Sequence, residues 1–162
     1  MKPLTREWIV KADGDYRTAC REWRVRRLPN YDAVCFHAQQ ATEKYLKARL
    51  QDADIAFEKT HNLIRLLDLA LAAEPTWDAF RSELGVLNQF AVAFRYPGES
   101  AQKSNAAQAL RICKSLRAEI RNALLVRNSG KLDRGHRGLA KRQSNSVTND
   151  SPNSSVASSK LL

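Results

Sequence analysis

The sequence has 162 residues and a net charge of +10, with 43% hydrophobic residues and only 6 glycines and 5 prolines. This length suits one folded domain with its own core, and the composition favours a helical protein. No apolar run approaches the roughly 18 residues that a membrane-spanning helix needs, and the first residues lack the apolar stretch of a signal peptide. We therefore expect a cytoplasmic protein with no membrane contact.

The basic charge is compatible with an anionic partner such as a nucleotide or nucleic acid, and equally with a role in solubility alone. Three scattered cysteines, Cys20, Cys35 and Cys113, form neither a disulfide framework nor a cluster with histidine. We predict that they behave as small apolar residues, and we predict no metal site and no cofactor.

Five helices can be predicted in chain order, each with a residue able to cap its start. Three of the connections contain proline, while the connection between the second and third helices, DADIAFEKT, contains neither proline nor glycine. They cover about residues 5–27, 31–52, 61–73, 77–94 and 101–125, with possible N-caps at Thr5, Asn30, Thr60, Thr76 and Ser100. No strand-like alternation is present. Helices of these lengths with short connections predict an all-α, up-and-down antiparallel bundle.

The composition changes after Asn128, where serine, asparagine, glycine and basic residues replace aromatic and large apolar side chains. Such a segment cannot offset the entropy lost on ordering. We therefore predict a helical domain over residues 1–127 and a disordered tail over residues 128–162.

The second predicted helix carries two neighbouring stripes at a period of 3.6 residues. An apolar seam that should face the core consists of Val34, Ala38, Ala41, Tyr45 and Ala48. A polar stripe beside it consists of His37, Gln40, Lys44 and Lys47. This stripe is either a solvated face or the lining of one groove, where lysines bind phosphate and the imidazole transfers protons. Glu43 is expected to pair with Lys47.

Three segments resemble the HEPN family, the higher eukaryotes and prokaryotes nucleotide-binding domain. They are CFHAQQATEKYLKA at 35–48, KTHNLIRLL at 59–67 and FRYPGES at 94–100, and the likeness covers about residues 5–125. It implies a compact helical bundle, often a homodimer. It also implies a minimal nucleotidyltransferase partner in a toxin–antitoxin pair, a nucleotide or RNA ligand, and a possible metal-independent ribonuclease activity.

The resemblance also supplies candidate site residues. Family ribonucleases carry an Arg near the end of the fourth helix and a His a few residues later. Arg95 matches the Arg, but no His occurs from Tyr96 to Gln102, and the RYPG form is typical of a branch that lacks this motif. The candidates for contacting a ligand or partner are His37, Gln40, Glu43, Lys44, Lys47 and Arg95.

Two positions keep alternative interpretations. Thr60, His61 and Asn62 can present backbone N–H groups to an anion at the start of the third helix. The favoured alternative is that Thr60 only caps this helix while His61 packs in its first turn. Arg95 can bind phosphate through two nitrogens, or it can neutralise the C-terminus of the fourth helix.

Two classes of function follow. The favoured one is a homodimer that binds nucleotide, RNA or a protein partner without catalysis. The alternative is a ribonuclease toxin in which Arg95 acts with His37 or His61 as a substitute acid or base. A DNA-binding role has only the positive charge in its support, because no helix-turn-helix signature is present.

Overall fold

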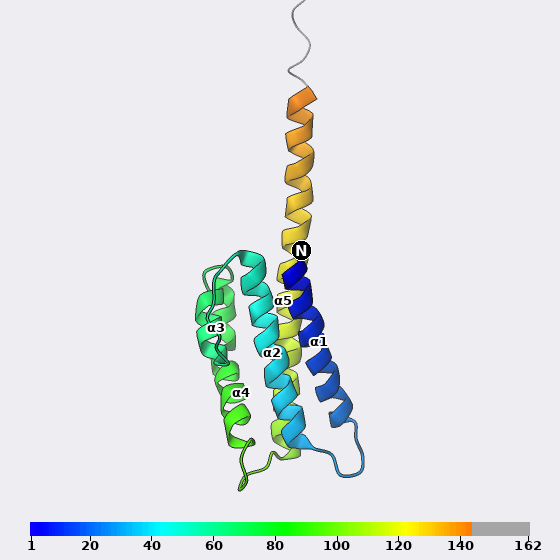
Figure 1. Ribbon diagram of the computed structural model, residues 1–162, viewed down its shortest axis with the longest axis vertical. Helices are drawn as coiled ribbons and strands as arrows, with labels where there is room; N and C mark the ends of the chain where they lie inside the picture. The colour runs from blue at the N-terminus through cyan, green and yellow to red at the C-terminus, as the bar shows by residue number, and fades with distance from the viewer. Residues whose placement is uncertain (144–162) are drawn as a thin grey trace, which may run out of the picture. The chain divides into compact units, whose positions relative to one another are not determined.

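The computed structural model describes the backbone of residues 1–143 and the side chains of residues 1–125. The chain divides into two units, Met1–Asn128 and Ser129–Leu162. Its helices are α1 (Pro3–Trp23), α2 (Tyr31–Ala53), α3 (Leu63–Ala70), the 3-10 helix η1 (Pro75–Phe80), α4 (Arg81–Ala93) and α5 (Lys103–Gln143) (Figure 1). No strand occurs among the described residues, and the predicted all-α bundle of about five helices is confirmed.

Helix α2 forms the centre of the first unit, with α1 on one side and α3 and α4 on the other (Figure 1). Fourteen of its 23 residues are buried, so it is a core helix rather than a surface one. Every residue of the predicted seam is fully buried, which confirms that stripe. Ala12 and Ala19 of α1 are fully buried too, and such small side chains allow two helices to approach closely.

The predicted N-cap of the second helix is confirmed, and that of the first helix is wrong. Asn30 caps α2 as predicted, because its Oδ1 accepts the Ala33 N–H at 2.9 Å. Thr5 does not cap α1. This helix begins at Pro3, whose fixed backbone suits a first helical position, and Thr5 is buried within the first turns.

The remaining helix starts lie later than predicted. Asn62, not Thr60, caps α3, since its Oδ1 accepts the Ile64 N–H at 2.9 Å. Thr76 lies inside η1, and α4 begins only at Arg81. Helix α5 begins at Lys103 rather than directly after Ser100. At the start of α3, where Thr60 and Asn62 can both cap, the residue nearer the apolar run is used.

Helix α5 is helical as far as Gln143, well beyond the end predicted near residue 125. The predicted disordered tail therefore begins with helical backbone, and residues 144–162 lie outside the described residues. Among the residues that the structure describes, no helix is long and apolar enough to cross a membrane.

Two of the three cysteines are buried in the core, as predicted, while Cys20 is half-buried. Burial raises the pKa of the Cys35 and Cys113 thiols to about 12. All three cysteines are free thiols.

Candidate functional site

The first half of the polar stripe faces α1, where it forms what we call the Asp15 cluster. His37 Nδ1 lies 3.0 Å from Asp15 Oδ1, and Lys44 Nζ lies 2.5 Å from Asp15 Oδ2. Gln40 belongs to the same cluster, because its Oε1 accepts from Lys44 at 3.2 Å. The side chains of His37, Asp15 and Lys44 are each between 19% and 28% exposed, so the cluster is partly screened from water.

Lys47, the last residue of the stripe, pairs with the buried Glu43 carboxylate. With His61 these two residues form what we call the Glu43 cluster. Lys47 Nζ lies 2.7 Å from Glu43 Oε1, which confirms the predicted pairing. His61 Nδ1 lies 3.1 Å from Glu43 Oε2, and Gln39 donates from Nε2 to the His61 carbonyl at 3.2 Å. Lys47 also lies over the Trp8 ring, 5.6 Å from its centroid. The expectation that the four stripe residues share one groove is therefore wrong.

The two clusters differ in how their histidines meet water. The side chain of His61 is 82% exposed, whereas that of His37 is 28% exposed. In both, the carboxylate contacts Nδ1, which favours the tautomer with a hydrogen on that atom and leaves Nε2 as the other functional nitrogen. Only at His61 is this ring held by a nearly fully buried carboxylate, since the Glu43 side chain is 4% exposed.

Arg95 directly follows the end of α4 and lines two adjoining hollows. The His61 hollow, about 300 Å³ in volume, also includes Gln39, His61, Asn62, Asn88 and Val92. The His37 hollow, about 250 Å³ in volume, also includes Asp32, Phe36, His37, Phe90 and Phe94. Ala91 lies in both. Within the part of the chain that the structure describes, the Arg95 guanidinium forms no hydrogen bond or ion pair.

The start of α3 does not offer N–H groups to an anion. The Leu63 N–H donates to Asn88 Oδ1 at 3.0 Å, and the N–H groups of Ile64 and Arg65 donate to Asn62 Oδ1. The Asn62 N–H donates to the Thr60 hydroxyl oxygen at 3.1 Å. Of the three N–H groups in the predicted anion site, that of Asn62 is therefore already paired. The alternative is wrong, because Asn62 rather than Thr60 provides the cap and the His61 side chain is 82% exposed.

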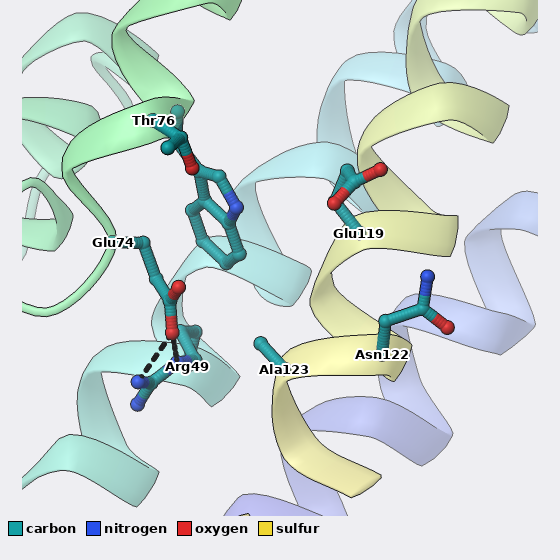
Figure 2. A pocket seen from close by; sticks show the side chains of 7 residues that line it. Arg49, Glu74, Thr76, Glu119, Asn122 and Ala123 are labelled. Atoms are coloured by element: carbon teal, nitrogen blue, oxygen red, sulfur yellow. Dashed lines mark hydrogen bonds and ion pairs between the residues drawn. The ribbon is translucent and has the colours of Figure 1, made fainter. Parts of the chain in front are cut away.

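A separate hollow of about 340 Å³ surrounds Arg49, a residue that the sequence pattern did not single out. Its Nε and Nη2 donate to Glu74 Oε1 at 2.9 and 2.6 Å, while Nη1 is buried without a partner. Figure 2 shows this pair across from Glu119 and Asn122 of α5. Because its lining holds two carboxylates and one guanidinium that is already paired, this hollow disfavours an anionic ligand.

A third polar cluster joins α1, α2 and α5 around Asp13. Tyr45 OH donates to Asp13 Oδ1 at 2.5 Å, and Arg121 Nη2 donates to Oδ2 at 2.6 Å. Arg117 Nε lies 3.2 Å from Asp13 Oδ1. Burial raises the pKa of the Asp13 carboxyl, but the hydrogen bonds from Tyr45 and the arginines outweigh it and hold the pKa below its ordinary value. This cluster holds helices together and lies outside both Arg95 hollows.

Comparison with known proteins agrees with the motifs. The crystal structure of TT1696 from Thermus thermophilus matches with a TM-score of 0.59 and 23% sequence identity, covering 74% of this chain and 97% of that chain. At this identity the likeness shows a shared fold. Comparison with curated proteins finds no match. The family model described as the HEPN domain matches residues 5–134, so the chain belongs to the HEPN domain family.

Proposed function

We propose that this HEPN protein binds nucleotide or RNA at Arg95, as a homodimer that acts with a minimal nucleotidyltransferase in a toxin–antitoxin-type pair. Membership of the HEPN family supports a nucleotide- or RNA-related role. The nucleotidyltransferase and the toxin–antitoxin pairing rest on the resemblance of the three motifs. Co-purification with the protein encoded by the neighbouring gene tests this partner, and absence of any complex with a nucleotidyltransferase would remove it.

The observation that carries the binding proposal is the position of Arg95. Its guanidinium is exposed, has no partner in the described part of the chain, and lies between two hollows. A planar guanidinium can donate two hydrogen bonds to one phosphate, and an unpaired one does so without first breaking an ion pair. The net charge of +10 attracts anionic ligands over a longer range.

Support for a homodimer comes from apolar side chains beside the same arginine. Phe36 is 41% exposed, Val92 is 64% exposed and Tyr96 is 65% exposed. Phe36 and Val92 each line one of the hollows, and a gathering of exposed apolar side chains is typical of a contact surface. We expect a dimer mass in light scattering and a monomer mass for Val92→Glu; a monomeric wild-type protein would contradict this.

The binding test is fluorescence anisotropy with a labelled single-stranded RNA and with a labelled ATP analogue. We expect Arg95→Ala to weaken binding by about tenfold or more, the value of one or two charge-assisted hydrogen bonds. Arg6→Ala, which removes the same charge from an exposed position of α1, is the matched control and should change affinity by less than about twofold. Equal effects of the two variants would overturn the role of Arg95.

A ribonuclease is the second candidate, favoured by an exposed His61 ring that is held by Glu43 and shares a hollow with Arg95. In such a reaction a base removes the proton of the RNA 2′-hydroxyl, whose oxygen then attacks phosphorus. The bond from phosphorus to the 5′-oxygen breaks, and an acid protonates the leaving oxygen. Cleavage that is lost in Arg95→Ala would replace the binding-only proposal. Cleavage that survives both His37→Ala and His61→Ala would remove the histidines as acid or base.

A further inference from the structure

We infer that the two hollows beside Arg95 hold the two ends of one nucleoside phosphate, with the phosphate in the His61 hollow and the base in the His37 hollow. This assignment rests on the proposed binding function and divides it between two places. It follows from the chemistry of the two linings, their shared residues and their sizes.

The His61 hollow is lined by hydrogen-bond donors and has no carboxylate in its lining. Arg95 supplies a guanidinium, His61 an imidazole, and Asn62 and Asn88 supply side-chain amides. Gln39 is only 2% exposed, and its Nε2 donates to the His61 carbonyl at 3.2 Å and to Glu43 Oε2 at 3.5 Å, so it fixes the backbone of His61 rather than binding the ligand itself. The nearby Glu43 carboxylate is neutralised by Lys47 at 2.7 Å. An anion with several acceptor oxygens, such as phosphate, matches this set of groups.

The His37 hollow has the opposite character. Phe36, Phe90 and Phe94 contribute three aromatic rings, and the Phe90 and Phe94 centroids lie 5.4 Å apart. Aromatic side chains stack with nucleobases of any sequence. The Asp32 carboxylate, whose Oδ1 accepts the Ala101 N–H at 2.5 Å, also lies in this lining. Its charge disfavours a phosphate here, while its oxygens can accept from an amino group at the edge of a base.

Size and connection make a single ligand the simplest occupant. Volumes of about 250 and 300 Å³ place each hollow at or below the lower end of the usual range for ligand pockets, about 300–1,000 Å³. Both hollows include Arg95 and Ala91, so a ligand that passes over this arginine can fill both. A phosphate joined to a ribose and a base has the required polar and aromatic ends.

The test is calorimetry with AMP, adenosine and pyrophosphate, on the full chain and three variants. His61→Asn should weaken the binding of AMP and pyrophosphate by about tenfold and change the affinity for adenosine by less than about twofold. Phe36→Ala should weaken the binding of AMP and adenosine, the two ligands that carry a base, by about tenfold. It should leave the affinity for pyrophosphate unchanged. Both side chains are substantially exposed, so the variants should fold. Arg6→Ala, at an exposed position outside both hollows, is the matched control and should leave all three ligands within about twofold.

The outcomes separate the two levels of the proposal. Binding that weakens equally for all three ligands in both variants, or in the swapped pattern, overturns the division between hollows while leaving nucleotide binding intact. Failure of the wild-type protein to bind AMP, ATP or RNA overturns the proposed function and this inference together. A single-stranded oligonucleotide that displaces AMP and binds more tightly identifies RNA as the source of the nucleoside phosphate, and the reverse order identifies a free nucleotide.

Discussion

The Asp15 and Glu43 clusters contain the same three kinds of group but differ in how deeply these groups are buried. Each joins a carboxylate to a histidine Nδ1 and to a lysine ammonium, at 3.0 and 2.5 Å in one and 3.1 and 2.7 Å in the other. In the Asp15 cluster all members are partly exposed and connect α1 to α2. In the Glu43 cluster the ion pair is buried and only the histidine meets water. Burial, rather than composition, decides which histidine is exposed to solvent.

The largest effect is expected from removal of the buried carboxylate. Glu43→Ala leaves the Lys47 ammonium unpaired at 8% exposure, and we expect a loss of about 3–5 kcal/mol in the free energy of unfolding. Asp15→Ala should cost only about 1–2 kcal/mol, because Lys44 can reach water. Urea unfolding measures both. Recovery in the double variant Glu43→Ala/Lys47→Met would trace the loss to the unpaired charge, and equal losses in the two single variants would contradict the comparison.

An intermediate effect is expected at Asp13, a carboxylate held by a tyrosine and two arginines. Its pKa is lower in the folded protein than its ordinary value of 3.8, so the ionised group stabilises the fold above that value. This stabilisation is lost as the pH falls through the folded pKa. We expect Asp13→Asn to cost about 1–3 kcal/mol at pH 7, and the difference from wild type to shrink in acid. A difference that stays constant from pH 7 to pH 2 would contradict the assignment.

The smallest effect is expected at the exposed histidine. His61→Asn should change the free energy of unfolding by no more than about 0.5 kcal/mol, because the His61 ring is 82% exposed and Glu43 keeps its ion pair with Lys47 when the imidazole is removed. His37→Asn should cost about 1 kcal/mol, since its ring is mostly covered and pairs with Asp15. Thermal unfolding at neutral pH measures both. A larger loss for His61→Asn would show that His61 supports the fold and would weaken its assignment to a ligand.

Periodicity predicted the features that lie within one helix. The seam from Val34 to Ala48, the cap at Asn30 and the Glu43–Lys47 pair each depend on spacing along the chain alone, and the structure has all three. The HEPN motifs added the family and the fold. Helix starts were less certain, because Thr60 and Asn62 can both cap and local propensity does not choose between them.

Features that need two distant segments were missed. Asp15 meets His37 and Lys44 only because α1 packs on α2, and no spacing within either helix indicates this contact. Gln39 was passed over for its neighbour Gln40. The available signal was its position four residues before Glu43 and seven before Leu46, on a second buried stripe of α2. A single apolar seam did not reveal the burial of Gln39, because a core helix is covered on more than one side.

The two buried cysteines give the folded protein a reporter of its own opening. Only the thiolate reacts with alkylating reagents. Burial covers the thiols of Cys35 and Cys113, and it raises their pKa to about 12, so they stay protonated at neutral pH. Their modification must therefore await a transient separation of α2 and α5 from their neighbours. The labelling rate of each of these two cysteines in the native protein thus measures how often its helix detaches, without any engineered cysteine.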